Sequence, residues 1–391
     1  MKIHISVALI TLLTTQVVIA SQWTYVPSLN VGTEYDDNLR LTSEPHDSVL
    51  GISASPGISA GRVTDASSIF AGGLLKLSRF DSDEVKDTNE QHYLFSSRYK
   101  TLLDEFRVNS VLSIDTSITR LVEWDAISAE QIDGLDISDV DEGLVKVNVR
   151  RERTNVTGSW KRKIDDVMNV SARYRFKGVY YDKESGTGLV DSKRHTIQAG
   201  VHRRIDDQSN VGLTLRYSDY QVSNNVQGSE SYELHSAYNF QIYSTLRANA
   251  GFGVGQTRYA DKTTDSLLFD VGLHKQSELT SYSINAGRDL RGSGPGTLVE
   301  SNRVYAKVTS KISPRLSYSI NAYLFRNNSI GVDSVSDRLF FRLEPALLWD
   351  LAQFWQADAR YRYRFEDLEN TAGNTKSNAI LLSISYVPNR K

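Results

Sequence analysis

The sequence predicts an all-β protein, a transmembrane antiparallel up-and-down β-barrel of about 18 strands with short periplasmic turns and long extracellular loops. Three observations predict this fold. Apolar and polar residues alternate with a period of two along most of the chain, and the connections between the alternating segments are short and long in turn. The segments also run for ~11–15 residues, against a mode of ~5–6 in soluble sheets. A soluble β-sandwich explains only the alternation.

The chain begins with a pattern typical of a secretory signal peptide. A short basic start at Met1-Lys2 precedes an apolar run from Ile5 to Ile19, and compact residues Val18-Ile19-Ala20 end it. We predict cleavage after Ala20, so that residues 1–20 are the signal peptide and residues 21–391 form one outer-membrane barrel. A single membrane anchor is the weaker alternative, because the run is short and no charge cluster follows it.

Along each expected strand, successive side chains alternate between two faces. In the first segment, Leu29, Val31, Thr33 and Tyr35 are separated by small or polar residues. Such alternation gives each strand one apolar and one wet face. The same pattern recurs over residues 50–60, 106–114, 168–180, 211–217, 232–240, 316–324, 357–365 and 380–386.

The connections favour a barrel over a sandwich. About eight short turns are expected near residues 62–66, 102–104, 164–166, 205–208, 243–245, 276–278, 312–314 and 350–353. About nine longer polar loops are expected near residues 36–47, 81–89, 120–142, 183–191, 222–229, 260–263, 291–299, 327–335 and 366–375. Short turns on one side and long loops on the other are typical of outer-membrane barrels, and both termini then lie in the periplasm.

The composition excludes several classes of protein. The chain has 45 Lys and Arg against 47 Asp and Glu, so no cationic excess favours nucleic acid. It has no Cys, which excludes disulfides, a thiolate nucleophile and cysteine metal sites. The mean hydropathy is −0.37, and after residue 20 no apolar run reaches the ~18 residues of a spanning helix.

No motif in the sequence predicts catalysis, a cofactor or a metal. There is no Ser-centred nucleophile elbow and no paired-His zinc motif, and the seven His residues are scattered. We therefore predict that the protein is not an enzyme, with a barrel hydrolase as the weakest alternative. The acidic residues Asp133, Asp136, Asp139 and Asp141 lack the EF-hand pattern and indicate a solvated loop. That loop, residues 120–142, is the longest, and it is a candidate constriction or gate.

The polar face predicts a basic lumen. A barrel of this strand number is wide enough for an aqueous channel, and rings of arginine favour anions. The predicted basic ladder consists of Arg98, Arg107, Arg173, Arg175, Lys177, Arg216, Arg303, Arg342, Arg360, Arg362 and Arg364. Two interpretations stay open: an acidic cargo moving along the ladder, or arginines paired with inward acids such as Glu34, Glu233 and Glu344.

Two short motifs carry a resemblance to a known family. Tyr35-Asp36-Asp37-Asn38 directly follows the first strand, and Arg150-Arg151-Glu152-Arg153-Thr154 enters the sixth. With the tandem hairpins, they make the chain similar to the outer-membrane β-barrel porin family found with bacterial exopolysaccharide and exosortase gene clusters. The resemblance implies a barrel that lets a secreted polysaccharide cross the outer membrane. The chain departs from the common outer-membrane ending, because it closes with Pro388-Asn389-Arg390-Lys391 and not with an aromatic residue.

The expected function follows from fold, lumen and resemblance together. We expect a channel in the bacterial outer membrane that exports an acidic exopolysaccharide or capsular polysaccharide. The expected partners are outer-membrane lipid and lipopolysaccharide, the polysaccharide cargo, a periplasmic polysaccharide-export partner and the barrel-assembly machinery, but no nucleic acid. The alternative is a general diffusion porin or a structural barrel without a dedicated cargo.

Overall fold

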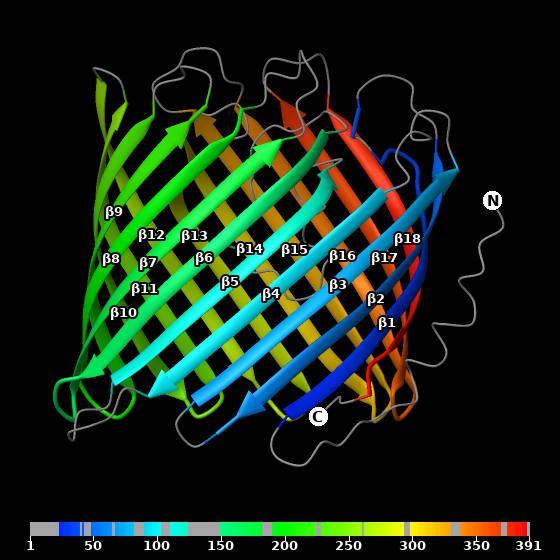
Figure 1. Cartoon of the computed structure of the whole chain (residues 1–391), viewed down its shortest axis with the longest axis horizontal. Coiled ribbons are helices and arrows are strands. Elements are labelled where there is room, and N and C mark those ends of the chain that lie inside the picture. Colours follow the sequence, from blue (N-terminus) through cyan, green and yellow to red (C-terminus); the bar gives the residue numbers. More distant parts are fainter. Residues whose placement is uncertain are drawn as a thin grey trace.

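The protein is a closed, 18-stranded antiparallel β-barrel (Figure 1). The computed structural model describes residues 23–39, 41–42, 48–64, 67–81, 90–102, 110–123, 149–181, 190–223, 228–259, 262–292, 298–329, 337–368 and 374–388. The predicted signal peptide, residues 1–20, lies outside the described residues, and its cleavage stays a prediction. No described segment is a helix long and apolar enough to cross a membrane.

The strand number and the up-and-down order are as predicted. The strands are β1 (Trp23–Asp36), β2 (Val49–Val63), β3 (Ser67–Asp81), β4 (Glu90–Leu102), β5 (Ser110–Glu123), β6 (Val149–Lys163), β7 (Met168–Tyr181), β8 (Ser192–Arg204), β9 (Ser209–Val222), β10 (Ser229–Tyr243), β11 (Leu246–Tyr259), β12 (Lys262–Gln276), β13 (Thr280–Gly292), β14 (Leu298–Ser313), β15 (Leu316–Ser329), β16 (Arg338–Ala352), β17 (Trp355–Leu368) and β18 (Thr375–Tyr386). Each strand pairs antiparallel with the next in sequence.

The first and last strands close the ring. β1 pairs with β18 from Leu29 opposite Tyr386 to Asp36 opposite Ala379. In the view of Figure 1, β9 lies at the left edge of the barrel, and β1 and β18 lie at the right edge. Strands β3 to β8 form the wall nearest the viewer, and β11 to β16 form the wall behind.

Two sequence predictions about connections need correction. The link at residues 260–263 was expected to be a long loop, but β11 ends at Tyr259 and β12 begins at Lys262, its partner in the ladder. The strand expected over residues 106–114 begins at Ser110, and Phe106 and Val108 lie outside the described residues. The predicted gate at residues 120–142 also lies outside them, apart from the last residues of β5.

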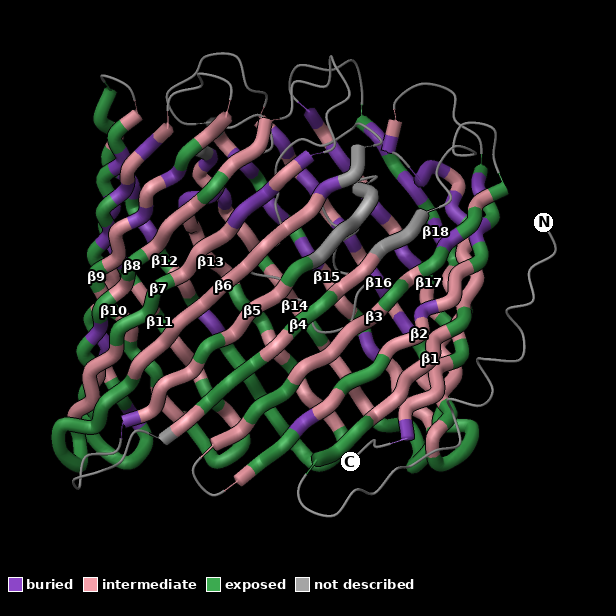
Figure 2. The backbone as a smooth tube through the Cα atoms, viewed as in Figure 1, coloured by how far each residue is buried: buried purple, intermediate pink, exposed green. Residues whose placement is uncertain are grey.

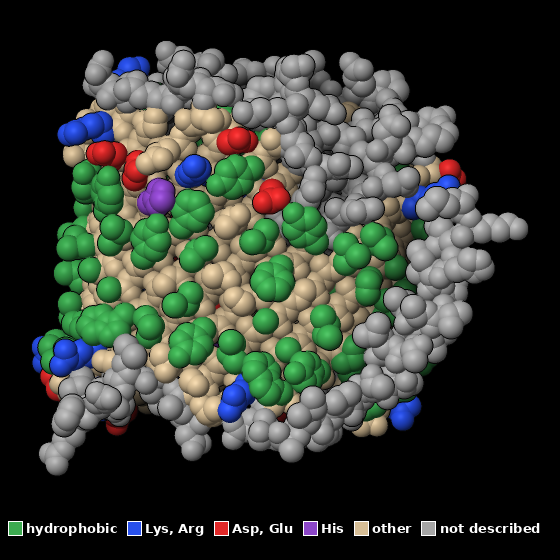
Figure 3. All heavy atoms as spheres, in the orientation of Figure 1, with side chains coloured by type: hydrophobic (Ala, Val, Ile, Leu, Met, Phe, Trp, Pro, Cys, Tyr) green, Lys and Arg blue, Asp and Glu red, His purple; other side chains and the backbone are tan. Residues whose placement is uncertain are grey.

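The outer face of the wall is apolar and exposed. Leu215 is 60% exposed, Phe252 59% and Ile284 52%, although all lie in mid-strand. Hydrophobic side chains are scattered over the described wall, and most charged side chains gather toward its two rims (Figure 3). A sandwich would bury these residues between its sheets, so the exposed apolar face excludes the soluble alternative.

An apolar outer face on a closed wall is how strands cross a membrane. Each described strand is hydrogen-bonded to a neighbour on both sides around the ring, so none of them is left as a free edge in the hydrocarbon. The bacterial outer membrane holds barrels of this kind. The barrel therefore spans the outer membrane, and the end with the short connections is its periplasmic end.

Candidate functional site

The lumen contains a cavity of about 470 Å³ against β17, β18, β1, β2, β3 and β4, and both polar and apolar side chains line it. Small side chains on the inner face make room for this cavity, among them Ser53, Ser55, Ser383 and Ser385. Asn30 lies at the closing seam and donates from Nδ2 to Ser385 Oγ at 2.7 Å. The volume falls within the ~300–1,000 Å³ of small-molecule sites, so the lumen has room for a small hydrophilic solute.

The predicted ladder residues that the structure describes lie on inner-face positions, and several of them are paired with acids. Arg98 pairs with Asp115, and Arg216 Nη1 lies 2.8 Å from Glu233 Oε2. Arg303 Nη2 lies 3.5 Å from Asp289 Oδ2. Arg107 lies outside the described residues. The others occupy β7 (Arg173, Arg175 and Lys177), β16 (Arg342) and β17 (Arg360, Arg362 and Arg364).

The wall made by β16, β17, β18 and β1 carries five arginines and seven carboxylates. Arg360 contacts Glu344 at 3.1 Å and Asp358 at 3.2 Å. Ion pairs in this wall therefore offset much of the positive charge that its own arginines bring. The arginines are Arg338, Arg342, Arg360, Arg362 and Arg364, and the acids are Glu34, Asp36, Glu344, Asp350, Asp358, Glu366 and Asp367.

A segment after β1 folds into the extracellular mouth. We call residues 37–39 and 41–42 the mouth segment. Leu41 is 1% exposed and packs with Tyr323, Phe325 and Phe340 on β15 and β16. Leu39 is 6% exposed and packs on the opposite side, with Val49 and Phe80. The mouth segment thus passes along the inner wall from β2 and β3 to β15 and β16, and the barrel is most buried toward this end (Figure 2).

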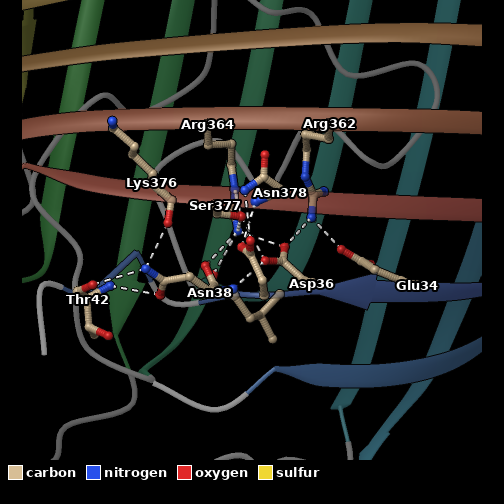
Figure 4. A network of polar contacts seen from close by, with 11 residues as sticks. Glu34, Asp36, Asn38, Thr42, Arg362, Arg364, Lys376, Ser377 and Asn378 are labelled. Carbon is tan, nitrogen blue, oxygen red and sulfur yellow. Dashed lines mark hydrogen bonds and ion pairs between the residues drawn. The ribbon is translucent and has the colours of Figure 1, made fainter. Parts of the chain in front are cut away.

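Asp36 fastens the mouth segment to the wall (Figure 4). Its Oδ2 accepts hydrogen bonds from Arg362 Nη2 at 2.9 Å and Arg364 Nη2 at 2.8 Å. Its Oδ1 accepts from Ser377 Oγ at 2.7 Å and from the backbone N–H of Asn38 at 2.9 Å. All of Asp36, Arg362, Arg364 and Ser377 are buried. One carboxylate therefore joins β1, β17, β18 and the mouth segment.

Additional hydrogen bonds from Arg364 and Asn38 hold the mouth segment in place. Arg364 also donates to the carbonyl oxygens of Asn38 and Leu39, each at 3.1 Å. Asn38 donates to the carbonyl oxygen of Thr42 at 3.0 Å and to that of Lys376 at 2.9 Å. The Asp-Asp-Asn sequence that carries the family resemblance is thus the fastening of this segment in the structure.

Leu41 adopts a strained backbone, with φ of 51°. A non-glycine residue in this left-handed region costs about 1–3 kcal/mol and persists only when its surroundings hold it. The aromatic cluster around its side chain supplies that hold.

We expect Leu41→Ala to loosen the mouth segment, because deleting a buried leucine side chain costs about 2–5 kcal/mol. The Arg40–Leu41 bond is a sequence site for trypsin, so faster cleavage there in intact barrels is the measurement. Leu41→Met retains apolar volume and should cleave at the wild-type rate. Equal rates for wild type and Leu41→Ala would show that the packing does not hold the segment.

A histidine and a carboxylate are brought together on the inner face of β10 and β12. His235 Nε2 lies 2.8 Å from Asp270 Oδ1, and Asn249 Nδ2 donates to Asp270 Oδ2 at 3.0 Å. Gly251 makes room for the pair, because a Cβ there would overlap Asp270 Oδ1. Among the described residues no hydroxyl hydrogen-bonds His235, and no group of three His, Asp or Glu is placed to hold a metal.

Sequence reasoning missed the mouth segment. The available signal was two leucines, Leu39 and Leu41, in a connection otherwise rich in polar residues. Apolar residues in an extracellular loop indicate that the loop packs against something. Their partners could not be read locally, since Phe325 and Phe340 lie almost three hundred residues away.

The fold is similar to solved β-barrels, although the sequence is not. No family model and no curated protein sequence matches the chain. Pseudomonas aeruginosa OpdQ is 10% identical over 93% of this chain and 98% of that chain, with a TM-score of 0.49. P. aeruginosa OpdK, solved with vanillate, is 9% identical over 93% and 98%, with a TM-score of 0.48. The FrpB iron transporter of Neisseria meningitidis is 9% identical over 94% and 82%, with a TM-score of 0.43. This chain is thus similar to them in fold, and its own residues must carry any argument about function.

Proposed function

We propose that the barrel is an outer-membrane diffusion channel for small hydrophilic solutes. The observation that carries the proposal is the cavity of about 470 Å³ inside a closed wall. Serine, asparagine and glycine residues line it together with Asp358, Arg360 and several leucines. The hydroxyl, amide and charged groups among them replace part of the hydration of a polar solute without selecting one chemical class.

Export of an acidic polysaccharide, the main expectation from the sequence, lacks support. The resemblance that implied it is not matched by any family model. The arginines of β17 that were expected to attract the polymer are paired with Glu34, Asp36, Glu344 and Asp358. The buried mouth segment also suits small solutes better than a polymer chain. The general porin, stated above as the alternative, fits these features better.

Liposome swelling tests the proposal. Liposomes with the purified barrel are expected to swell in isosmotic arabinose or glucose, and progressively more slowly in sucrose and raffinose. The matched control is the same liposomes without protein. Swelling no faster than this control, for the wild type and for a variant with a released mouth segment, would indicate a sealed structural barrel. Loss of surface polysaccharide on gene deletion, with solute permeability unchanged, would favour export instead.

A further inference from the structure

The periplasmic half of the lumen carries basic side chains that differ from the paired arginines near the mouth. Lys100, Lys161 and Arg173 are exposed and lie on inner-face positions of β4, β6 and β7. None of the three forms an ion pair or hydrogen bond with a described residue, whereas Arg362 and Arg364 are buried among acids.

The strand register places these three cations on one patch of wall. Lys100 lies opposite Ser113, Ser113 lies opposite Ser159, and Ser159 lies opposite Arg173. Lys100 and Arg173 are therefore in the same row, three strand spacings or about 14 Å apart at the backbone. Lys161 is two residues from Ser159 on the same face of β6. We call Lys100, Ser113, Ser159, Lys161 and Arg173 the basic patch.

The centre of the patch offers hydroxyl groups. Ser113 Oγ and Ser159 Oγ are 2.6 Å apart, so one hydroxyl donates to the other and a proton is left for a further acceptor. The carboxylate nearest in register is Asp115, which is engaged by Arg98. Long flexible stems let the lysine and arginine heads converge over the serines.

Cations also stand on the facing wall. Arg247 on β11 and Lys307 on β14 are exposed inner-face residues without an ion pair to a described residue. β4 to β7 and β11 to β14 belong to the two opposite walls of the barrel (Figure 1). Cations on both walls therefore attract an anion at the patch, and the low-dielectric walls focus the electric field of these cations.

We propose that the basic patch binds small organic anions with two or more carboxylates. A single carboxylate cannot span cations whose backbones lie about 14 Å apart, whereas a di- or tricarboxylate engages two or three heads at once. This proposal names a class of solute for the proposed diffusion channel. Transport of these anions rests on the proposed channel function, whereas their binding to the basic patch does not. It also predicts that these anions bind from the periplasmic side.

Citrate is the probe, and binding is measured by isothermal titration to the full barrel in detergent at low ionic strength. Citrate is expected to bind, and acetate at equal ionic strength to bind much more weakly. Lys161→Gln with Arg173→Gln should weaken citrate binding about tenfold, since each lost charge removes a modest, screened attraction. The matched control is Arg162→Gln with Arg203→Gln, which removes two charges from outward positions of neighbouring strands and should leave binding within about twofold.

Current recordings in planar bilayers distinguish anion binding at the basic patch from conduction through the barrel. Citrate on the periplasmic side should block chloride current more strongly than citrate on the other side, and the patch variant should relieve the block. A barrel that conducts but binds citrate no better than acetate, or loses binding equally in both double variants, overturns the patch. A barrel that does not conduct but binds citrate through Lys161 and Arg173 overturns the channel and leaves the patch standing.

Discussion

Asp36→Ala is expected to release the mouth segment and raise the single-channel conductance. The substitution removes a buried carboxylate from between Arg362 and Arg364, which lie 2.9 and 2.8 Å from Oδ2. Removing one member of a buried ion pair costs about 3–5 kcal/mol, because the remaining charge is left without compensation. The Asn38 backbone and Ser377 lose the same acceptor.

Two measurements detect the release of the mouth segment. Planar-bilayer recordings should show larger unitary currents than wild type, and trypsin should cleave faster at Arg40–Leu41. Asp206→Asn is the control, since Asp206 is an exposed carboxylate in a periplasmic turn that bonds only local groups. Unchanged conductance together with faster cleavage would show that the segment does not narrow the pathway.

A milder variant guards against misfolding. Asn38→Ala removes the hydrogen bonds to Thr42 and Lys376 but leaves the ion pairs of Asp36 intact. It should shift conductance in the same direction by a smaller amount. A wild-type conductance in Asn38→Ala and a collapsed barrel in Asp36→Ala would mean that Asp36 supports the wall and not the mouth segment.

Leu215→Arg is expected to destabilise the barrel in the membrane by about 2–4 kcal/mol, the cost of arginine on a lipid face near the midplane. Leu215 is 60% exposed and lies in the middle of β9. Thr214→Arg is the matched control, because the preceding residue of the same strand faces the lumen. The measurement is the urea midpoint of unfolding in lipid vesicles. Equal losses for the two variants would contradict the assignment of lipid and lumen faces.

Strand number and faces could be predicted because the information is local. Side-chain direction alternates residue by residue, so Leu213 and Leu215 on one face and Thr214 on the other are readable without any partner strand. The connections between strands carry turn residues that mark each reversal. The link at residues 260–263 was misjudged because polar composition does not fix loop length when the flanking residues can pair, as Tyr259 and Lys262 do.

The charge state of the lumen could not be predicted in the same way. Arg362 lies near Asp36 and Glu34, which are more than three hundred residues away in sequence. Such pairs depend on the register across the closing strands, and alternation within one strand fixes only which residues share a face, not which of them lie opposite each other. The described ladder residues lie on inner-face strand positions, but several of them are paired with acids that the sequence did not place beside them, and the role of the ladder in passing anions stays a prediction.

The fastening at Asp36 also reports on biogenesis. Its members come from the first strand and the last two, so they meet only once the two ends of the chain have been joined. A truncated or half-inserted polypeptide keeps Asp36 but lacks its basic and hydroxyl partners, so we expect trypsin to cleave it after Arg40 faster than it cleaves the closed barrel. The rate of that cleavage would then distinguish completed barrels from incomplete ones.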